Sequence, residues 1–328
     1  MNIIVEKQMD LQEIEELKQY RALHGPYLNP RRDFVFKALF TDNSEQGRLA
    51  LTGIIEATTG RSVREAAVVN NEPAALFKED KHCAFDVSAV FNDGERAEIE
   101  MQGQNDQGSF ADRITYLAAR LMAYNVRSGQ DYADMRSVYQ IAITDFTLTS
   151  GQELLTHYRL YSPERKAELG NSRLNVITLE LPKIKPFLKS GVETLSKAQL
   201  WGIFLKKADD PEYEGLVREI CLKEKSIMAA QEKLKVLSME EPEWLRQLHE
   251  DKAIMDYVSR RNHAIRTGLK QGLEQGMQQG LEQGLKQGIS QGIAQARAET
   301  ALNLKDMGLS VEQIAKATGL SEQEILSL

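Results

Sequence analysis

The chain has 328 residues, of which 42% are hydrophobic and 27% are charged, and these values are typical of globular proteins. Its formal net charge of −7 excludes a protein that is basic as a whole, so any binding of nucleic acid requires a local positive patch. No apolar run reaches the length of a membrane span, and the N-terminal segment lacks the apolar core of a signal peptide, so we expect no membrane partner.

Three helices are predicted in the first part of the chain. Amphipathic spacing predicts the first over Asp10–Leu23. A short second helix covers Asp33–Phe40, with Asp33 in the N-cap position. The third covers Ser44–Thr58, and Ser44 is a suitable capping residue.

A β-hairpin is predicted next. The segments Cys83–Phe91 and Glu95–Gln102 both alternate apolar and polar residues, as half-buried strands do. The residues between them, Asn92–Gly94, have the Asn-Asp-Gly composition of a tight turn. The hairpin is informative because the length of its loop decides which side chains share a face.

A loop of three residues, with Gly94 in the left-handed conformation, pairs Phe91 with Glu95. Counting back along both strands then places Asp86 opposite Glu100, with their Cβ atoms about 5 Å apart on one face. A loop of two residues would shift the pairing by one and place the two carboxylates on opposite faces. The expectation of a site here therefore depends on whether the loop has three residues or two.

Gln102 lies two residues after Glu100 and points the same way, so two carboxylates and an amide are expected to converge. Carboxylates that close repel each other unless a cation lies between them. The alternative is that these side chains are solvated on an exposed sheet face, as charged residues often are. Glu98 shares the face, and we expect it to be solvated.

The rest of the pattern predicts an α/β fold, with a mixed sheet flanked by helices that closes near Lys185. A helix is expected over Ser109–Gly129, and the pattern from Leu195 to Ile265 is helical. Four further segments have the apolar content of strands: Val63–Val69, Val138–Phe146, His157–Tyr161 and Asn175–Leu181.

Four motifs occur in a fixed order along this part of the chain. They are Asp33-Phe-Val-Phe-Lys37-Ala-Leu-Phe40, Asp86 on a strand, Ile99-Glu100-Met101-Gln102 at the end of the next strand, and Arg113 with Tyr116 on a helix. In order and spacing they resemble the PD-(D/E)XK nuclease superfamily, and more narrowly the Rpn group of recombination-promoting nucleases and transposases. The resemblance covers roughly residues 29–185.

The resemblance implies a restriction-endonuclease-like fold with catalytic positions at Asp86, Glu100 and Gln102, and with Asp33 beside them. It also implies that Asp86, Glu100 and the carbonyl of Met101 hold Mg²⁺ or Mn²⁺. The chain departs from the superfamily at Gln102, where a lysine is usual. Glutamine can orient a water molecule through hydrogen bonds but cannot take up its proton.

The resemblance further implies that Lys37, Arg113 and Tyr116 bind the DNA backbone. Each has an ordinary structural alternative. Asp33 can cap its helix while Lys37 is solvated one turn later, and Arg113 can be exposed while Tyr116 is part of the core.

The leading hypothesis is therefore a Mg²⁺-dependent DNA endonuclease that hydrolyses phosphodiester bonds with low sequence preference, in recombination, mobile elements or defence. The alternative is a DNA-binding or oligomerisation protein whose catalytic site has decayed, with Gln102 as the mark of that decay. The two cysteines, Cys83 and Cys221, lie in apolar surroundings, which favours buried free thiols and a cytoplasmic location.

The C-terminal part has a different character. From Gly268 to Gly292 a glycine recurs at every fourth residue, each followed by Leu, Met or Ile. Seven glycines would destabilise an isolated helix by about 6 kcal/mol relative to alanine. One interpretation is a flexible tether. The other, which we favour, is a helix whose glycine groove admits a second helix closely, so that the chain forms a homo-oligomer.

The last segment, Val311–Leu328, resembles a helix-turn-helix, but its second helix is acidic and short, which favours a small packing pair. The expected organisation has five parts in chain order. These are an N-terminal helical extension (1–28), the nuclease-like domain (29–190), an all-helical region (191–266), the glycine-repeat helix or tether (267–297) and a C-terminal helical hairpin (298–328).

Overall fold

The computed structural model of the chain describes residues 11–69, 86–104, 108–123, 131–169 and 173–328. The chain divides into two compact units, Met1–Glu250 and Asp251–Leu328. The first unit contains the sheet and most of the helices, and the second contains the greater part of one long helix and the two short helices that follow it.

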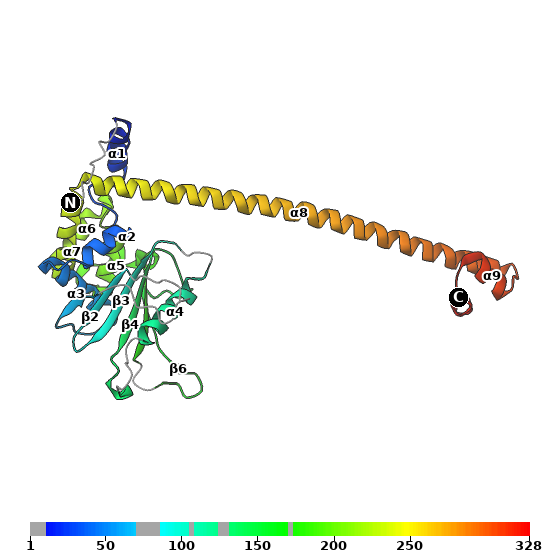
Figure 1. Ribbon diagram of the computed structural model, residues 1–328, viewed down its shortest axis with the longest axis horizontal. Helices are drawn as coiled ribbons and strands as arrows, with labels where there is room; N and C mark the ends of the chain where they lie inside the picture. Colours follow the sequence, from blue (N-terminus) through cyan, green and yellow to red (C-terminus); the bar gives the residue numbers. More distant parts are fainter. Residues whose placement is uncertain (1–10, 70–85, 105–107, 124–130, 170–172) are drawn as a thin grey trace, which may run out of the picture. The chain divides into compact units, whose positions relative to one another are not determined.

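The first unit is built on a mixed six-stranded sheet with strand order β1-β2-β3-β4-β8-β5 (Figure 1). Three central strands, β3, β4 and β8, run parallel, while β1, β2 and β5 pair antiparallel with their neighbours. The strands are β1 (Ala66–Val68), β2 (Val87–Phe91), β3 (Glu95–Gln102), β4 (Val138–Thr144), β5 (Leu155–Tyr158) and β8 (Leu174–Glu180). A separate short ribbon pairs β6 (Tyr161–Ser162) with β7 (Ala167–Glu168).

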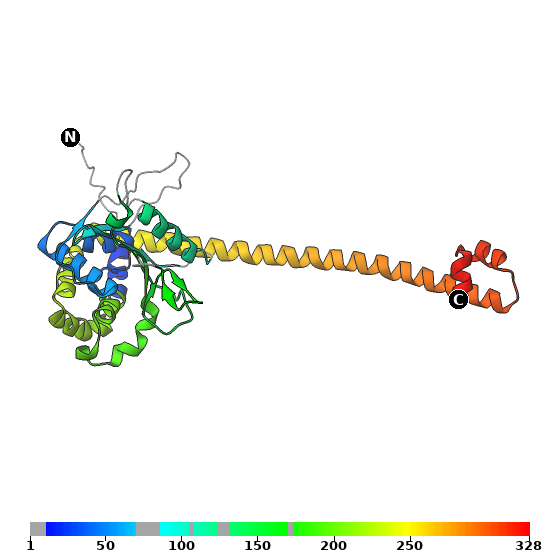
Figure 2. The same ribbon diagram turned by 90° about the horizontal axis from the view of Figure 1, so that it is seen from below.

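Helices cover both faces of this sheet (Figures 1 and 2). One face carries α4 (Phe110–Ala123), whose Phe110 and Ile114 pack against Ala142 of β4. The opposite face carries α2 (Asp33–Phe40) and α3 (Glu45–Thr59), with further helices behind them. Because β3, β4 and β8 are covered on both sides, most of their residues are buried.

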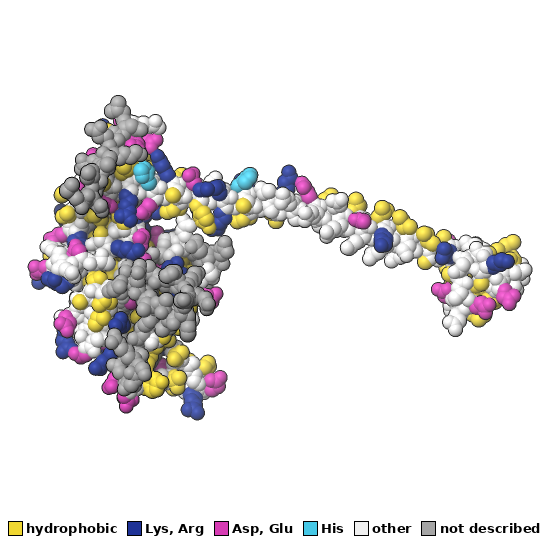
Figure 3. All heavy atoms as spheres, in the orientation of Figure 1, with side chains coloured by type: hydrophobic (Ala, Val, Ile, Leu, Met, Phe, Trp, Pro, Cys, Tyr) yellow, Lys and Arg dark blue, Asp and Glu magenta, His cyan; other side chains and the backbone are white. Residues whose placement is uncertain are grey.

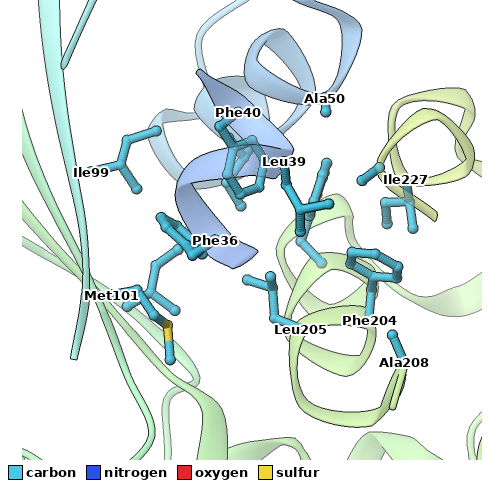
Figure 4. Close-up of a cluster of buried hydrophobic side chains, with 14 of the residues drawn as sticks. Phe36, Leu39, Phe40, Ala50, Ile99, Met101, Phe204, Leu205, Ala208 and Ile227 are labelled. Carbon is cyan, nitrogen blue, oxygen red and sulfur yellow. The ribbon is translucent and has the colours of Figure 1, made fainter. Parts of the chain in front are cut away.

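The main core lies between the sheet and the helical layer, and α2 is at its centre (Figure 4). Phe36 of α2 lies close to Ile99 and Met101 of β3, while Phe40 packs against Trp201 in a tilted arrangement, with 5.7 Å between the ring centroids. This packing fixes α2 against the C-terminal half of β3. It therefore positions the polar residues of α2 at that end of the sheet.

Three further helices of the first unit follow the last strand: α5 (Lys197–Lys207), α6 (Glu214–Lys223) and α7 (Lys225–Leu237). Helix α1 (Leu11–His24) lies at the start of the described chain. Of the short 3₁₀ segments, η1 (Tyr132–Asp134) lies between α4 and β4, η2 (Leu181–Lys189) and η3 (Val192–Thr194) lie between β8 and α5, and η4 (Pro211–Tyr213) connects α5 to α6. Cys221 on α6 is a free, buried thiol, and burial raises its pKa to about 11.

The second unit consists of helices joined by short turns. Helix α8 (Glu241–Asp306) begins in the first unit and includes every glycine of the repeat. Its Ala301 packs against Ile314 of α9 (Val311–Thr318) and Ile325 of α10 (Glu322–Ser327). Both short helices begin with a serine capping box, at Ser310 and Ser321.

Several predicted boundaries need correction. The strand predicted over His157–Tyr161 lies two to three residues earlier, because β5 covers Leu155–Tyr158 and Tyr161 begins the separate ribbon. The strand over Val63–Val69 is reduced to three residues. Residues 83–85 of the first hairpin strand and residues 124–129 of the helix predicted over Ser109–Gly129 lie outside the described residues.

Candidate active site

The hairpin has the register that a three-residue loop requires. Phe91 pairs with Glu95, and the ladder continues to the pair of Val87 with Ile99. Gly94 has a φ of 93°, a conformation that glycine adopts without strain, and its N–H donates to the carbonyl of Phe91 at 3.2 Å. The predicted loop is therefore confirmed.

The same register, continued by one residue, brings Asp86 opposite Glu100. Asp86 lies just before β2, and its Oδ2 accepts a hydrogen bond from the Met101 N–H at 2.9 Å. Since the N–H and C=O of one strand residue point to the same side, the Met101 carbonyl is also directed toward Asp86. One carbonyl oxygen and one carboxylate thus converge at the end of the hairpin.

Helix α2 adds a cation to this end of the sheet. Lys37 Nζ lies 2.7 Å from Asp33 Oδ1 and 3.4 Å from Asp86 Oδ1. The prediction that Asp33 caps the helix is wrong, because Arg32 occupies the N-cap position and Asp33 is the first helical residue. Its carboxylate is instead paired with Lys37 one turn later, where both side chains are close to Asp86.

Helix α4 adds a second cation from the opposite face. Because Phe110 and Ile114 face the sheet, the neighbouring Arg113 reaches Glu100 of β3 and forms an ion pair with it. The Glu100 side chain is almost completely buried, whereas that of Arg113 is 50% exposed. The guanidinium can therefore contact both the site and a molecule in solvent.

Two of the predicted residues do not contact the carboxylates. Gln102 ends β3 on the same face as Glu100, but its amide Nε2 donates to the carbonyl of Gln104 at 3.0 Å. Tyr116 is exposed rather than part of the core, and its hydroxyl accepts a hydrogen bond from Arg120 Nη1 at 3.1 Å.

Burial shapes the electrostatics of the two carboxyl groups. Burial, together with the charge of Asp86, raises the pKa of Glu100 to about 7 against the opposing effects of Arg113 and Lys37. Burial also raises the pKa of Asp86, although the Met101 N–H and Lys37 act in the opposite direction. Burial lowers the pKa of Lys37, but Asp33 and Asp86 more than reverse that effect. Burial therefore disfavours the charged form of both carboxyl groups, and a nearby cation would stabilise that form.

The oxygen atoms at this end of the hairpin could bind a divalent cation. Glu100 Oε2 is buried and has no hydrogen-bond partner, which leaves an oxygen available to a ligand. Asp86 and the Met101 carbonyl supply further oxygens on the same side. Within the described residues no cluster of three or more His, Cys, Asp or Glu side chains is present. Two carboxylates and a carbonyl suit Mg²⁺, which usually keeps several water ligands.

Sequence reasoning missed Glu98, which we expected to be solvated. Glu98 is only 3% exposed, and it accepts a hydrogen bond from Ser88 Oγ across the strand pair at 2.5 Å. Burial raises its pKa to about 8, while Ser88 and Arg96 lower it in part. The signal was the serine directly opposite Glu98 in the predicted register, because a hydroxyl can partner a buried carboxyl group.

Comparison with known proteins gives one match. A family model described as "PD-(D/E)XK nuclease family transposase" matches residues 30–264, which include the sheet, α2 and α4. No curated protein and no solved structure matches the chain significantly. Of the described helices, none is both long enough and apolar enough to cross a membrane.

Proposed function

The chain belongs to the PD-(D/E)XK nuclease family transposases, and we propose on this premise that it is a metal-dependent endonuclease that hydrolyses phosphodiester bonds in DNA. The observation that carries the proposal is the meeting of Asp86 and Glu100 at one end of the hairpin, with Lys37 and Arg113 paired to them from two helices. Such a group of buried acids and basic side chains fits phosphate chemistry assisted by a cation.

In the proposed mechanism Asp86, Glu100 and the Met101 carbonyl would hold Mg²⁺ or Mn²⁺. When bound, the ion makes a water molecule more acidic and stabilises the charge that develops on the phosphate. Asp33 acts indirectly, because it holds the ammonium group of Lys37 close to Asp86. These residues define where the scissile phosphate must lie.

The remaining residues bind and orient the substrate. Lys37 and Arg113 contact phosphate oxygens, and the half-exposed guanidinium of Arg113 can offer two donors at once. The Tyr116 hydroxyl accepts from Arg120, so its own proton remains available to a backbone phosphate. Gln102 orients the attacking water by hydrogen bonding. Because an amide does not accept a proton, the proton leaves to solvent or to the phosphate itself.

Cleavage of plasmid DNA by the purified full chain, with Mg²⁺, with Mn²⁺ and with chelator, tests the proposal. Asp86→Ala and Glu100→Ala should each abolish cleavage and weaken divalent-metal binding measured by calorimetry without DNA, since each removes a charged ligand. Glu219→Ala, an exposed acid on α6, should do neither. Equal cleavage by the parent and by Asp86→Ala would show that the activity resides elsewhere.

Gln102 has its own pair of variants. Gln102→Ala should slow cleavage by about 10-fold to 100-fold while metal affinity is retained, because only a water-orienting group is lost. Gln104→Ala removes an exposed amide two residues later and should leave the rate unchanged. DNA binding without cleavage under every metal condition would instead favour the decayed binding protein.

The proposal also includes self-association through α8. Its glycine repeat lies entirely in the helix, and the apolar residue after each glycine is 50–77% exposed (Figure 3). At all seven glycines an added Cβ would meet no atom within 4 Å. Two adjacent stripes, one of glycine and one of Leu, Met or Ile, fit the close approach of a second copy of this helix.

A further inference from the structure

A cavity of about 410 Å³ lies at the opposite end of the sheet from the two carboxylates. Four arginines from three separate segments line it. Arg61 and Arg64 lie between α3 and β1, Arg136 precedes β4, and Arg173 precedes β8. The strands thus begin at this cavity, and the loop of the β2–β3 hairpin forms one of its walls. We call these four side chains the arginine cluster.

The cavity is positively charged even though the chain is acidic. Among the described residues that line it, the acidic ones are Asp93 and Glu95. Arg64 pairs with Asp93 at 2.9 Å, and Arg61 lies 3.5 Å from Glu95. Four arginines against two carboxylates leave a net charge of +2, in a chain whose total is −7. This is the local positive patch that the overall charge makes necessary for binding a polyanion.

The chemistry of the cluster favours a phosphate ligand. A guanidinium offers paired N–H donors that match two oxygens of one phosphate group. Serine hydroxyls and an asparagine complete the lining, at Ser62, Ser137 and Asn92. Arg173 donates to the carbonyl of Ala133 at 3.1 Å, which fixes its guanidinium at the edge of the cavity. The described lining residues are all polar or charged, which does not suit an apolar ligand.

The cavity is open to solvent, which favours a polymer over a small enclosed ligand. The side chain of Arg64 is 71% exposed and its partner Asp93 is 78% exposed. Glu95 at the cavity and Glu100 at the candidate active site lie on the same strand, five residues and about 17 Å apart. A DNA duplex rises about 3.4 Å per base pair, so both places fall within about five base pairs.

From these observations we propose that the arginine cluster is a second phosphodiester-binding site for DNA, which holds the backbone at a distance from the cleaved bond. The inference rests on the proposed function for the nature of the ligand. It adds a contact that determines affinity and the minimum length of substrate. Asp93 limits this contact because it competes with phosphate for Arg64.

The test is the binding of a fluorescently labelled duplex of about 20 base pairs to the full chain, in chelator, over a range of salt concentrations. Arg64→Gln should weaken binding by about 3-fold to 10-fold and reduce the salt dependence by about one ion. Asp93→Asn should have the opposite effect and tighten binding, since it frees Arg64. A misfolded variant would not produce that gain.

Arg159→Gln is the matched control, because Arg159 is also an exposed arginine, paired with Glu168 at 3.0 Å, but does not line the cavity. Equal affinities for Arg64→Gln and Arg159→Gln, or no gain from Asp93→Asn, would overturn the inference. Pyrophosphate at matched ionic strength is the second arm. If it raises the melting temperature of the parent but not of Arg64→Gln, while both bind DNA equally, the cavity takes a small phosphate compound instead.

The outcome is separable from that of the proposed function, because binding is measured without metal and cleavage with it. If Arg64→Gln lowers DNA affinity but the parent protein never cleaves DNA, the second binding site is supported and the nuclease assignment is contradicted. If the parent protein cleaves DNA but Arg64→Gln and Arg159→Gln bind DNA with equal affinity, the nuclease assignment is supported and the second site is contradicted.

Discussion

Glu98 shows how the surroundings of a residue decide its chemistry. Alternation along β3 identifies the face that Glu98 shares with Glu100, but does not reveal that α4 covers this side of the sheet. A hairpin with one exposed face would have left Glu98 in water. Here β3 is a central strand with β4 beside it, so the carboxyl group is buried against Ser88. Sequence patterns predict which face of the sheet a side chain points to more readily than how deeply it is buried.

A variant of Glu98 tests this environment through pH. Its pKa rises from the ordinary 4.5 to about 8 in the folded chain, so the folded state binds the proton more tightly than the unfolded state. The stabilisation is complete below pH 4.5 and is lost as pH rises through about 8. Glu98→Gln mimics the protonated form. The free energy of unfolding of this variant should therefore fall less than that of the parent between pH 4.5 and about 8, and the two decreases should differ by more than about 1 kcal/mol.

Denaturant unfolding of both proteins in chelator, at several pH values, is the measurement. Glu219→Gln changes an exposed acid and should follow the parent profile. Parallel profiles for the parent and Glu98→Gln would mean that Glu98 is ionised in the folded protein at neutral pH. Glu100 titrates in the same region, so part of the parent's loss with pH should persist in the variant.

At the scale of elements, the sequence predicts best where a local rule is strict. Asn-Asp-Gly determined the loop, and the loop determined the pairing that brings Asp86 to Glu100. The strand β4 was recognisable because a run of apolar residues suits a strand covered on both faces. The position of α2 against the site was not predictable from its own pattern, because packing on Trp201, far along the chain, holds it there.

Gly94 gives a direct test of the loop. Its φ of 93° lies in the left-handed region, so Gly94→Ala should lower the free energy of unfolding by about 1–2 kcal/mol. Space is not the obstacle, because an added Cβ would lie 3.8 Å from Arg136 Cγ. Gly191→Ala is the control: its φ is −62° and its Cβ position is open, so that variant should be neutral or slightly stabilising. Equal stabilities for the two variants would contradict the loop conformation.

At the scale of the whole molecule, the two units differ in how their apolar residues are used. The first unit buries its large apolar side chains in one main core, whereas α8 exposes a regular stripe of them in the second. Residues such as Leu269, Met277 and Leu285 are not required to be apolar in a solvated spacer. The strict period of four in both stripes therefore points to a partner surface, and identical chains supply an identical helix.

Light scattering on the full chain and on a chain that ends at Arg266 tests the proposed self-association. The shorter chain retains the whole sheet and its helices, so it should still fold but should have fewer protomers per particle. Equal protomer numbers for both would leave the glycine helix as a spacer. Because truncation removes many residues at once, a finer variant is needed to show that the glycine stripe itself forms the contact.

The finer variant is Gly276→Ala with Gly280→Ala. In a helix without a partner these changes should be stabilising, by about 1 kcal/mol each, because alanine has the higher helix propensity and the added methyl groups meet no other atom. In a packed pair the same methyl groups lie between two backbones and force them apart, so helicity should rise while the protomer number falls. Gln278→Ala with Glu282→Ala changes the opposite face of the same turns and should leave the assembly intact. If the glycine variant has higher helicity but an unchanged protomer number, the contact lies elsewhere. Only where two helices pack closely does glycine stabilise the assembly more than alanine.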